Sequence, residues 1–268
     1  MSELEPFYKP LDDPGGTRFY ATFSTTGPWF ADAQHLGPPT ALLIRALERC
    51  PQSRPDTAPM ELSRITVEVL GPVPAAEVSV HAQLERPGRT IELLAAEMTA
   101  GGRAVLRARA WRLAAGDTAA VAVGHAEPLP GPEKAATRSE RPDGWLPGFM
   151  DAMEWRFFRG SLGTPGPGVA WMRQRVPLID GEEPSALQRL AVVADSANGV
   201  AAVLDMRQWL FVNTELTIHL HRPPTGEWIG LDAATVVGPR GCGTVAATLF
   251  DGSGHVGRVA QSLTIRPR

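Results

Sequence analysis

Cysteine is nearly absent from this 268-residue chain, which has only Cys50 and Cys242. Two cysteines cannot form the disulfide framework of a small secreted protein, and they cannot form a multi-cysteine metal site. The sequence therefore indicates a protein of a reducing compartment, and 43% hydrophobic residues are enough for a large packed core.

Neither charge is in large excess. The chain has 26 Lys and Arg residues and 29 Asp and Glu residues, which gives a net charge of −3. A chain without a broad basic face is not expected to bind nucleic acid through its phosphates. A small molecule is the more natural partner.

Long hydrophobic runs are lacking as well. A membrane-spanning helix needs ~20 apolar residues, whereas the most apolar stretch, residues 187–206, is interrupted by charged and amide side chains. The acidic start at residues 1–6 lacks the basic and apolar regions of a signal peptide. We expect a cytoplasmic protein with no membrane partner.

An internal repeat organises the chain. Residues 65–72 (ITVEVLGP) align with 216–223 (LTIHLHRP) at an offset of 151 (216 − 65), and each reads as an alternating strand. Residues 102–113 align with 254–265 at an offset of 152 (254 − 102), as a one-residue insertion would give. This second alignment puts Arg109 at the position of Gln261.

Each half is predicted to have a helix before its strands. Residues 40–49 (TALLIRALER) favour a helix capped by Thr40, after two prolines at 38 and 39. Residues 185–204 predict a longer helix with a break near Asn198 and Gly199. The expected strands of the second half lie at residues 210–222, 227–237, 243–250 and 256–266.

Residues 117–147 are rich in proline, glycine and charge, which is typical of a linker. We therefore predict an N-terminal repeat at 1–116 and a C-terminal repeat at 148–268. A helix followed by antiparallel strands buries its apolar stripe when the sheet curls around it, and two such sheets can join edge to edge. The fold class predicted from the residues is a duplicated α+β unit.

The second half resembles the TesB-like, type II acyl-CoA thioesterases, and the first half fits the same family more loosely. The resemblance rests on residues 193–198 (VADSAN), 213–224 (NTELTIHLHRPP), 249–254 (LFDGSG) and 259–263 (VAQSL). It implies a double hotdog fold, in which each helix is wrapped by an antiparallel sheet. It also implies an acyl-CoA substrate, no metal or redox cofactor, and a homodimer or higher homo-oligomer.

The family holds a water molecule with an aspartate, a hydroxyl residue and a glutamine. Carried over by position, these are Asp195, Asn213 and Gln261, with an amide at 213 in place of the hydroxyl. Asp195 would deprotonate the water, the two amides would fix it, and a backbone N–H near Gly199 would receive the oxyanion.

Other interpretations of the same residues stay open. Asp195 is also suited to cap the helix that follows it. A hotdog hydratase or dehydratase would need an Asp/His pair, and the sequence offers no histidine beside Asp195. The helix start at residues 35–39 also lacks a matching carboxylate, so the second half is expected to hold the chemistry. A third possibility is an acyl-CoA or lipid-binding module without catalysis.

His219 and His221 would share one face of a strand, as in a two-ligand metal site. A third ligand is not evident from the sequence, so packing or substrate contact is the preferred interpretation.

Overall fold

The strands of the protein form one long antiparallel sheet. The computed structural model describes residues 4–13, 15–56, 58–135, 137–138 and 141–268, so the first three residues of the acidic start lie outside the described part. Within it, the sheet has fourteen strands in the order β1-β2-β4-β5-β6-β3-β11-β14-β13-β12-β9-β8-β7, with β10 also paired to β14. The strands of the first half are β1 (Tyr8–Pro10), β2 (Arg18–Ala21), β3 (Met60–Val69), β4 (Glu77–Arg86), β5 (Ile91–Ala100) and β6 (Arg103–Ala114). Those of the second half are β7 (Thr137–Arg138), β8 (Met153–Arg159), β9 (Gly168–Gln174), β10 (Trp209–Asn213), β11 (Glu215–Leu220), β12 (Ile229–Val237), β13 (Cys242–Asp251) and β14 (Gly254–Pro267).

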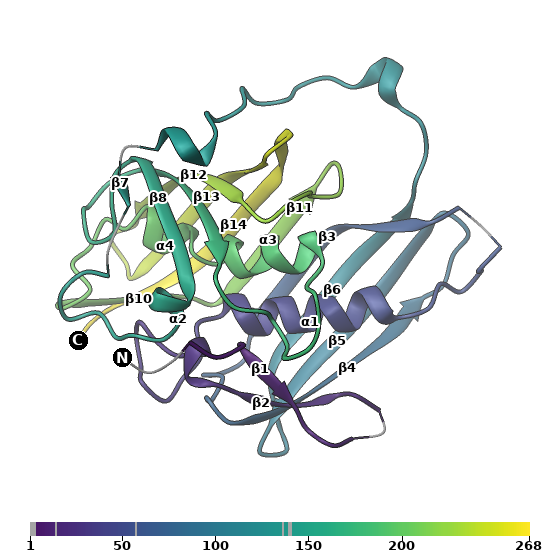
Figure 1. Ribbon diagram of the computed structural model, residues 1–268, viewed down its shortest axis with the longest axis horizontal. Helices are drawn as coiled ribbons and strands as arrows, with labels where there is room; N and C mark the ends of the chain where they lie inside the picture. The colour runs from purple at the N-terminus through teal and green to yellow at the C-terminus, as the bar shows by residue number, and fades with distance from the viewer. Residues whose placement is uncertain (1–3, 14, 57, 136, 139–140) are drawn as a thin grey trace.

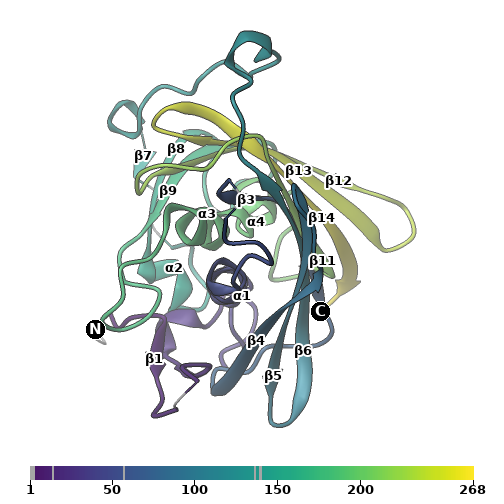
Figure 2. The same cartoon turned by 90° about the vertical axis from the view of Figure 1, so that its right-hand side faces the viewer.

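The helices lie on one face of this sheet, which curves around them (Figure 1 and Figure 2). They are α1 (Gly37–Arg49), α2 (Phe149–Ala152), α3 (Ala186–Ala194) and α4 (Ala197–Val200). Helix α1 packs on β4 and β5, while α3 and α4 pack on β9 and β12. Each half is thus a helix wrapped by an antiparallel sheet, and the predicted double hotdog is confirmed.

The two half-sheets join edge to edge at β3 and β11, as expected. Thr66 lies opposite Thr217 in this antiparallel pair, and the Thr217 hydroxyl is 3.2 Å from that of Thr66. The offset of 151 (217 − 66) is the offset of the sequence repeat, so equivalent residues of the two halves meet here. A local pseudo-two-fold axis therefore passes through the seam.

The strand register corrects one repeat alignment. Thr66 pairs with Arg109 in β6, whereas its counterpart Thr217 pairs with Ala260 in β14. Gln261 therefore corresponds to Ala110, and the predicted match to Arg109 is wrong. A slip of one residue reverses the face of every side chain, which explains why Arg109 faces solvent while Ala110 and Gln261 are buried.

The first helix starts earlier than predicted. It begins at Gly37, its N-cap residue Leu36 makes no side-chain capping bond, and its first turn contains two prolines. Proline suits the first turn because the N–H it lacks would have no intrahelical partner. Thr40, the predicted cap, is instead buried inside the helix.

The break in the second predicted helix falls at Asp195 and Ser196, before the predicted position. Ser185 caps α3 by accepting a hydrogen bond from the Gln188 N–H. The expected strand at 210–222 is also two strands, β10 and β11, interrupted at Thr214. The break in the helix leaves the Asp195 side chain at the end of α3.

The segment after β6 runs away from the sheet and back (Figure 1). Its described residues include two short 3-10 turns, Ala119–Val121 and Pro132–Lys134, and the strand β7, which pairs with β8. The boundaries of the predicted repeats and linker stay a prediction. Among the described residues no helix is long and apolar enough to cross a membrane.

Helices α1 and α3 pack side by side and run antiparallel. The start of α1 meets the end of α3 at Gly37, where an added Cβ would overlap the backbone carbonyl of Val192. The end of α1 meets the start of α3, where Glu48 accepts hydrogen bonds from Ser185 and Gln188. Glycine at position 37 is what allows the two backbones to approach so closely.

Gly37→Ala is expected to destabilise the protein by about 1–3 kcal/mol, because a Cβ at this site forces two packed helices apart. Gly199→Ala is the matched control, since a Cβ at Gly199 meets no atom within 4 Å. Urea unfolding of both variants measures the effect. Equal stability of Gly37→Ala and the native protein would show that the helix contact is not tight.

Candidate active site

Asp195 is a buried carboxyl group at the centre of a polar cluster. It lies at the end of α3 and is 3% exposed. It does not cap the following helix, because the N-cap residue of α4 is Ser196. The capping interpretation is therefore wrong, and the carboxyl accepts hydrogen bonds from outside its own helix.

The three residues predicted from the sequence meet at this carboxyl. Asn213, the last residue of β10, donates from Nδ2 to Asp195 Oδ1 at 2.9 Å. Gln261, in the neighbouring β14, donates from Nε2 to the same oxygen at 3.1 Å and to the Asp195 backbone carbonyl at 3.0 Å. Strands β10 and β14 pair so that Asn213 lies opposite Leu263, which brings both amides to one face.

His35 is the fourth side chain of the cluster. The sequence offered no histidine beside Asp195, and this expectation is wrong. Its Nδ1 lies 3.1 Å from Asp195 Oδ2. His35 comes from the first half, two residues before α1, and it reaches Asp195 because the start of α1 meets the end of α3 at Gly37. His35 and Asp195 are 160 residues apart in the chain (195 − 35), so no local sequence pattern indicates that they are in contact. The site therefore lies between the halves, and it is not confined to the second one.

The backbone at the start of α1 also binds the carboxyl. The N–H groups of Leu36 and Gly37 face the carboxyl and lower the pKa of Asp195. Burial raises the pKa of Asp195 from its ordinary 3.8 to about 7, and the hydrogen bonds from Asn213, the two backbone groups and Gln261 oppose this rise only in part. The Asp195 carboxyl can therefore accept a proton near neutral pH.

The imidazole of His35 is uncharged at neutral pH. Its ring stacks on Phe149 with centroids 3.6 Å apart, and burial lowers its pKa from 6.5 to about 3. Its Nδ1 accepts a hydrogen bond from the Gly37 N–H at 3.1 Å. His35 and Asp195 together therefore hold one proton between about pH 3 and pH 7, and it lies on the carboxyl.

A cavity of about 290 Å³ opens at this cluster. Its wall is mostly apolar and comes from both halves, with Asp195, His35, Asn198 and Asn213 supplying polar groups. The apolar lining includes Trp29, Phe30, Leu36, Val69, Leu70, Pro72, Val73 and Val212. An apolar pocket with a few convergent polar groups suits a ligand that has an apolar chain and a polar reacting centre.

A second, smaller pocket of about 20 Å³ adjoins the cavity. Trp29, His35 and Asn198 line both spaces, and the rings of Trp29 and Phe211 pack edge to face. Trp145, Met150 and Trp155 also line the smaller pocket.

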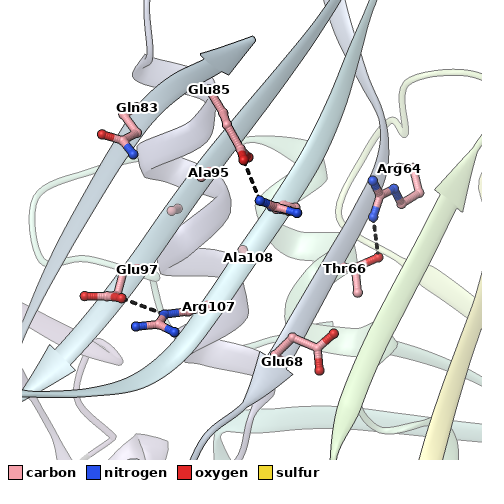
Figure 3. Close-up of a pocket in the computed structure, with 11 residues that line it drawn as sticks. Arg64, Thr66, Glu68, Gln83, Glu85, Ala95, Glu97, Arg107 and Ala108 are labelled. Carbon is pink, nitrogen blue, oxygen red and sulfur yellow. Dashed lines mark hydrogen bonds and ion pairs between the residues drawn. The ribbon is translucent and has the colours of Figure 1, made fainter.

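A larger hollow, of about 550 Å³, lies on the other face of the sheet (Figure 3). Four of its charged side chains form the ion pairs Arg107–Glu97 and Arg109–Glu85. None of the described titratable groups that line it is buried, so the cavity at Asp195 is the better candidate for a reaction.

No group of three metal-ligating side chains occurs among the described residues. His219 and His221 are both exposed, and His221 lies just after the end of β11 at Leu220. The ring of His221 lies between those of His125 and His255.

The sequence matches two family models, one for each half. The acyl-CoA thioesterase N-terminal domain matches residues 25–113, and the acyl-CoA thioesterase C-terminal domain matches residues 132–265. The chain belongs to the acyl-CoA thioesterase family. It is a thioester hydrolase of the TesB-like type, as the resemblance implied.

Solved structures share the fold of this thioesterase along nearly its whole length. A hot dog fold protein from Alicyclobacillus acidocaldarius has a TM-score of 0.72 and 16% identity over 95% of each chain. The tesB protein of Mycobacterium avium subs paratuberculosis has a TM-score of 0.67 and 16% identity over 96% of each chain. An acyl-CoA thioesterase II from Mycobacterium marinum has a TM-score of 0.63 and 16% identity, over 92% of this chain and 96% of that one. No curated protein sequence matches the chain.

The paired pKa shifts predict how the stability of the thioesterase depends on pH. Unfolding restores the ordinary pKa values of 3.8 for Asp195 and 6.5 for His35. Native and unfolded states then each hold one proton on this pair between about pH 4 and 6.5, so its two contributions cancel. Asp195→Asn leaves only the His35 contribution, because unfolded His35 binds a proton that native His35 does not. Its stability should rise with pH in this window.

His35→Gln should have the opposite dependence of stability on pH. Native Asp195 keeps a proton that unfolded Asp195 has lost, so stability should fall as pH rises from about 4 to 7. Urea midpoints of the two variants at several pH values, each compared with the native protein, measure the slopes. Slopes of the same sign would contradict the assigned protonation states.

Proposed function

We propose that the protein hydrolyses an acyl-CoA thioester with a water molecule activated by Asp195. The observation that supports this most directly is the buried Asp195 carboxyl, with a pKa near 7, beside an apolar cavity and in contact with the amides of Asn213 and Gln261. A base of this strength can take a proton from water at neutral pH. The apolar wall suits the acyl chain, and the opening suits the bulky thiol portion.

The reaction follows from these groups. Asp195 takes a proton from the water as its oxygen attacks the thioester carbon, and Asn213 and Gln261 hold the water and the carboxylate in line. Gln261 supports this role further, because its Oε1 is buried and has no partner among the described residues, so it can accept a hydrogen bond from the water. The tetrahedral intermediate then breaks its C–S bond, and the leaving thiolate takes the proton back from Asp195.

We also propose that the protein acts in the cytoplasm. Both cysteines are free thiols, which is consistent with a reducing compartment. The expected homodimer or higher homo-oligomer stays a prediction.

The His35–Asp195 pair favours a second candidate reaction, the addition or removal of water at the α,β bond of an acyl thioester. One group would move a proton to or from carbon while the other moves a proton on oxygen. The missing histidine was the sequence argument against this reaction, and His35 Nδ1 lies 3.1 Å from the carboxyl.

Asp195→Asn should lower kcat for thiol release by about 10²–10⁴, the usual contribution of a general base. The substitution keeps the shape of the side chain and removes the base. Thiol release from saturated acyl-CoAs of increasing chain length is the measurement, and Asp232→Asn, at an exposed ion pair with Arg159, is the matched control.

Three other outcomes would contradict hydrolysis at Asp195. Full activity of Asp195→Asn would exclude Asp195 as the base. Consumption of a 2-enoyl-CoA without thiol release would assign the hydration reaction. A rise in melting temperature with acyl-CoA, without any turnover, would assign a binding module.

The hydrolysis rate should rise with pH and level off above about 7, since Asp195 acts as a base only when ionised. Asn213→Ala removes the donor that lowers this pKa most, so its midpoint should move to higher pH. The kcat/KM values of both proteins against pH are the measurement. An identical midpoint in the two would show that Asn213 does not bind the ionised carboxylate.

A further inference from the structure

Asn198 has a buried side chain that makes no hydrogen bond to the other described residues of the site. It lies in α4, three residues after Asp195, and is 8% exposed. Its side chain makes no hydrogen bond with any residue that the structure describes, although it lines the cavity beside Asp195 and Asn213. An amide that lines a cavity and makes no hydrogen bond within the protein is free to bind a polar group of a ligand.

The reaction also needs a hydrogen-bond donor at the thioester oxygen. Hydrolysis develops negative charge on the thioester oxygen, and one or more hydrogen-bond donors must stabilise that charge. At the start of α1 the Gly37 N–H donates to His35 Nδ1, the Leu36 N–H faces the Asp195 carboxyl and lowers its pKa, and Pro38 and Pro39 have no N–H. The helix start that contacts the carboxyl therefore has no donor left.

Several other nearby donors are also in use. The N–H of Gly199, the candidate from the sequence, donates to the Ser196 carbonyl at 3.0 Å, and the N–H of Val200 donates to the same carbonyl. The side-chain amides of Asn213 and Gln261 donate to Asp195. Asn198 is the lining amide with both N–H groups unused among the described residues.

We propose that Asn198 Nδ2 binds the thioester carbonyl oxygen of the substrate and stabilises the oxyanion during hydrolysis. This inference rests on the proposed function. The oxygen of the attacked carbonyl gains the electron pair of the C=O bond when water attacks, and it returns that pair when the C–S bond breaks. Asn198 would therefore be a catalytic residue, with Asp195 on one side of the carbonyl carbon and the amide at its oxygen.

The kinetic test uses Asn198→Ala and Asn198→Asp. Removal of one oxyanion donor typically lowers kcat by about 10²–10³, and we expect this loss in Asn198→Ala with KM changed by no more than a few-fold. Asn198→Asp should be at least as impaired, because its carboxylate repels the oxyanion. Ser196→Ala is the matched control, since its buried hydroxyl also lacks a partner among the described residues and does not line the cavity at Asp195.

A binding test separates this inference from the proposed hydrolysis. Two stable acyl-CoA analogues are compared: a ketone, which keeps the carbonyl group and replaces sulfur by a methylene, and a thioether, which lacks the carbonyl. The native protein should bind the ketone more tightly, and Asn198→Ala should lose this preference. That result supports carbonyl binding even if the native protein releases no thiol, the outcome that would overturn the proposed function alone.

Two results would overturn the role of Asn198. One is a kcat of Asn198→Ala within about threefold of the native value, well below the expected effect of a lost donor. The other is an unchanged preference for the ketone in both variants. Melting temperatures identify a misfolded variant, and the remaining variant then decides the question.

Discussion

The site depends on the close contact between α1 and α3. Gly37 lets the start of α1 approach the Val192 carbonyl at the end of α3. This approach brings His35 and two backbone N–H groups from the first half to a carboxyl in the second. The sheet supplies Asn213 and Gln261 from the other side, because β10 and β14 pair along the same face. The candidate site and the packing of α1 against α3 therefore both depend on Gly37.

Burial of Asp195 explains why so many donors surround it. A carboxylate away from water is unfavourable unless it is hydrogen-bonded, and the neutral form is favoured until enough donors compensate. The cluster stops short of full compensation, so the group keeps a pKa near neutrality. A stronger set of donors would leave a stable carboxylate that is a poor base, while a fully apolar site would leave a carboxylic acid.

Much of this arrangement is present in the sequence. The repeat and the alternating strands predicted a duplicated α+β chain, and the segments around Asp195, Asn213 and Gln261 indicated which residues meet. The contact of His35 was missed because it joins residues from different halves, and neither periodicity nor spacing reports such a contact. Thr40 was mistaken for a cap, since helix propensity could not reveal that the helix begins with two prolines in its first turn. The predicted match of Arg109 to Gln261 is wrong by one residue. The strand pairing of β3 with β6 and of β11 with β14 was needed to find the correct alignment.

The seam at Thr66 and Thr217 makes this chain equivalent to a dimer of hotdog subunits within one polypeptide. Identical subunits would place the same site at both ends of the antiparallel helix pair, because a two-fold axis repeats every contact. Here the two ends differ. One has the buried carboxyl and His35, and the other has Glu48, an exposed side chain bonded to Ser185 and Gln188. Because the halves are joined in one chain, the two ends of the helix pair need not be identical. Among the described residues the candidate site therefore occurs at one end, where a symmetric pair would have it at both.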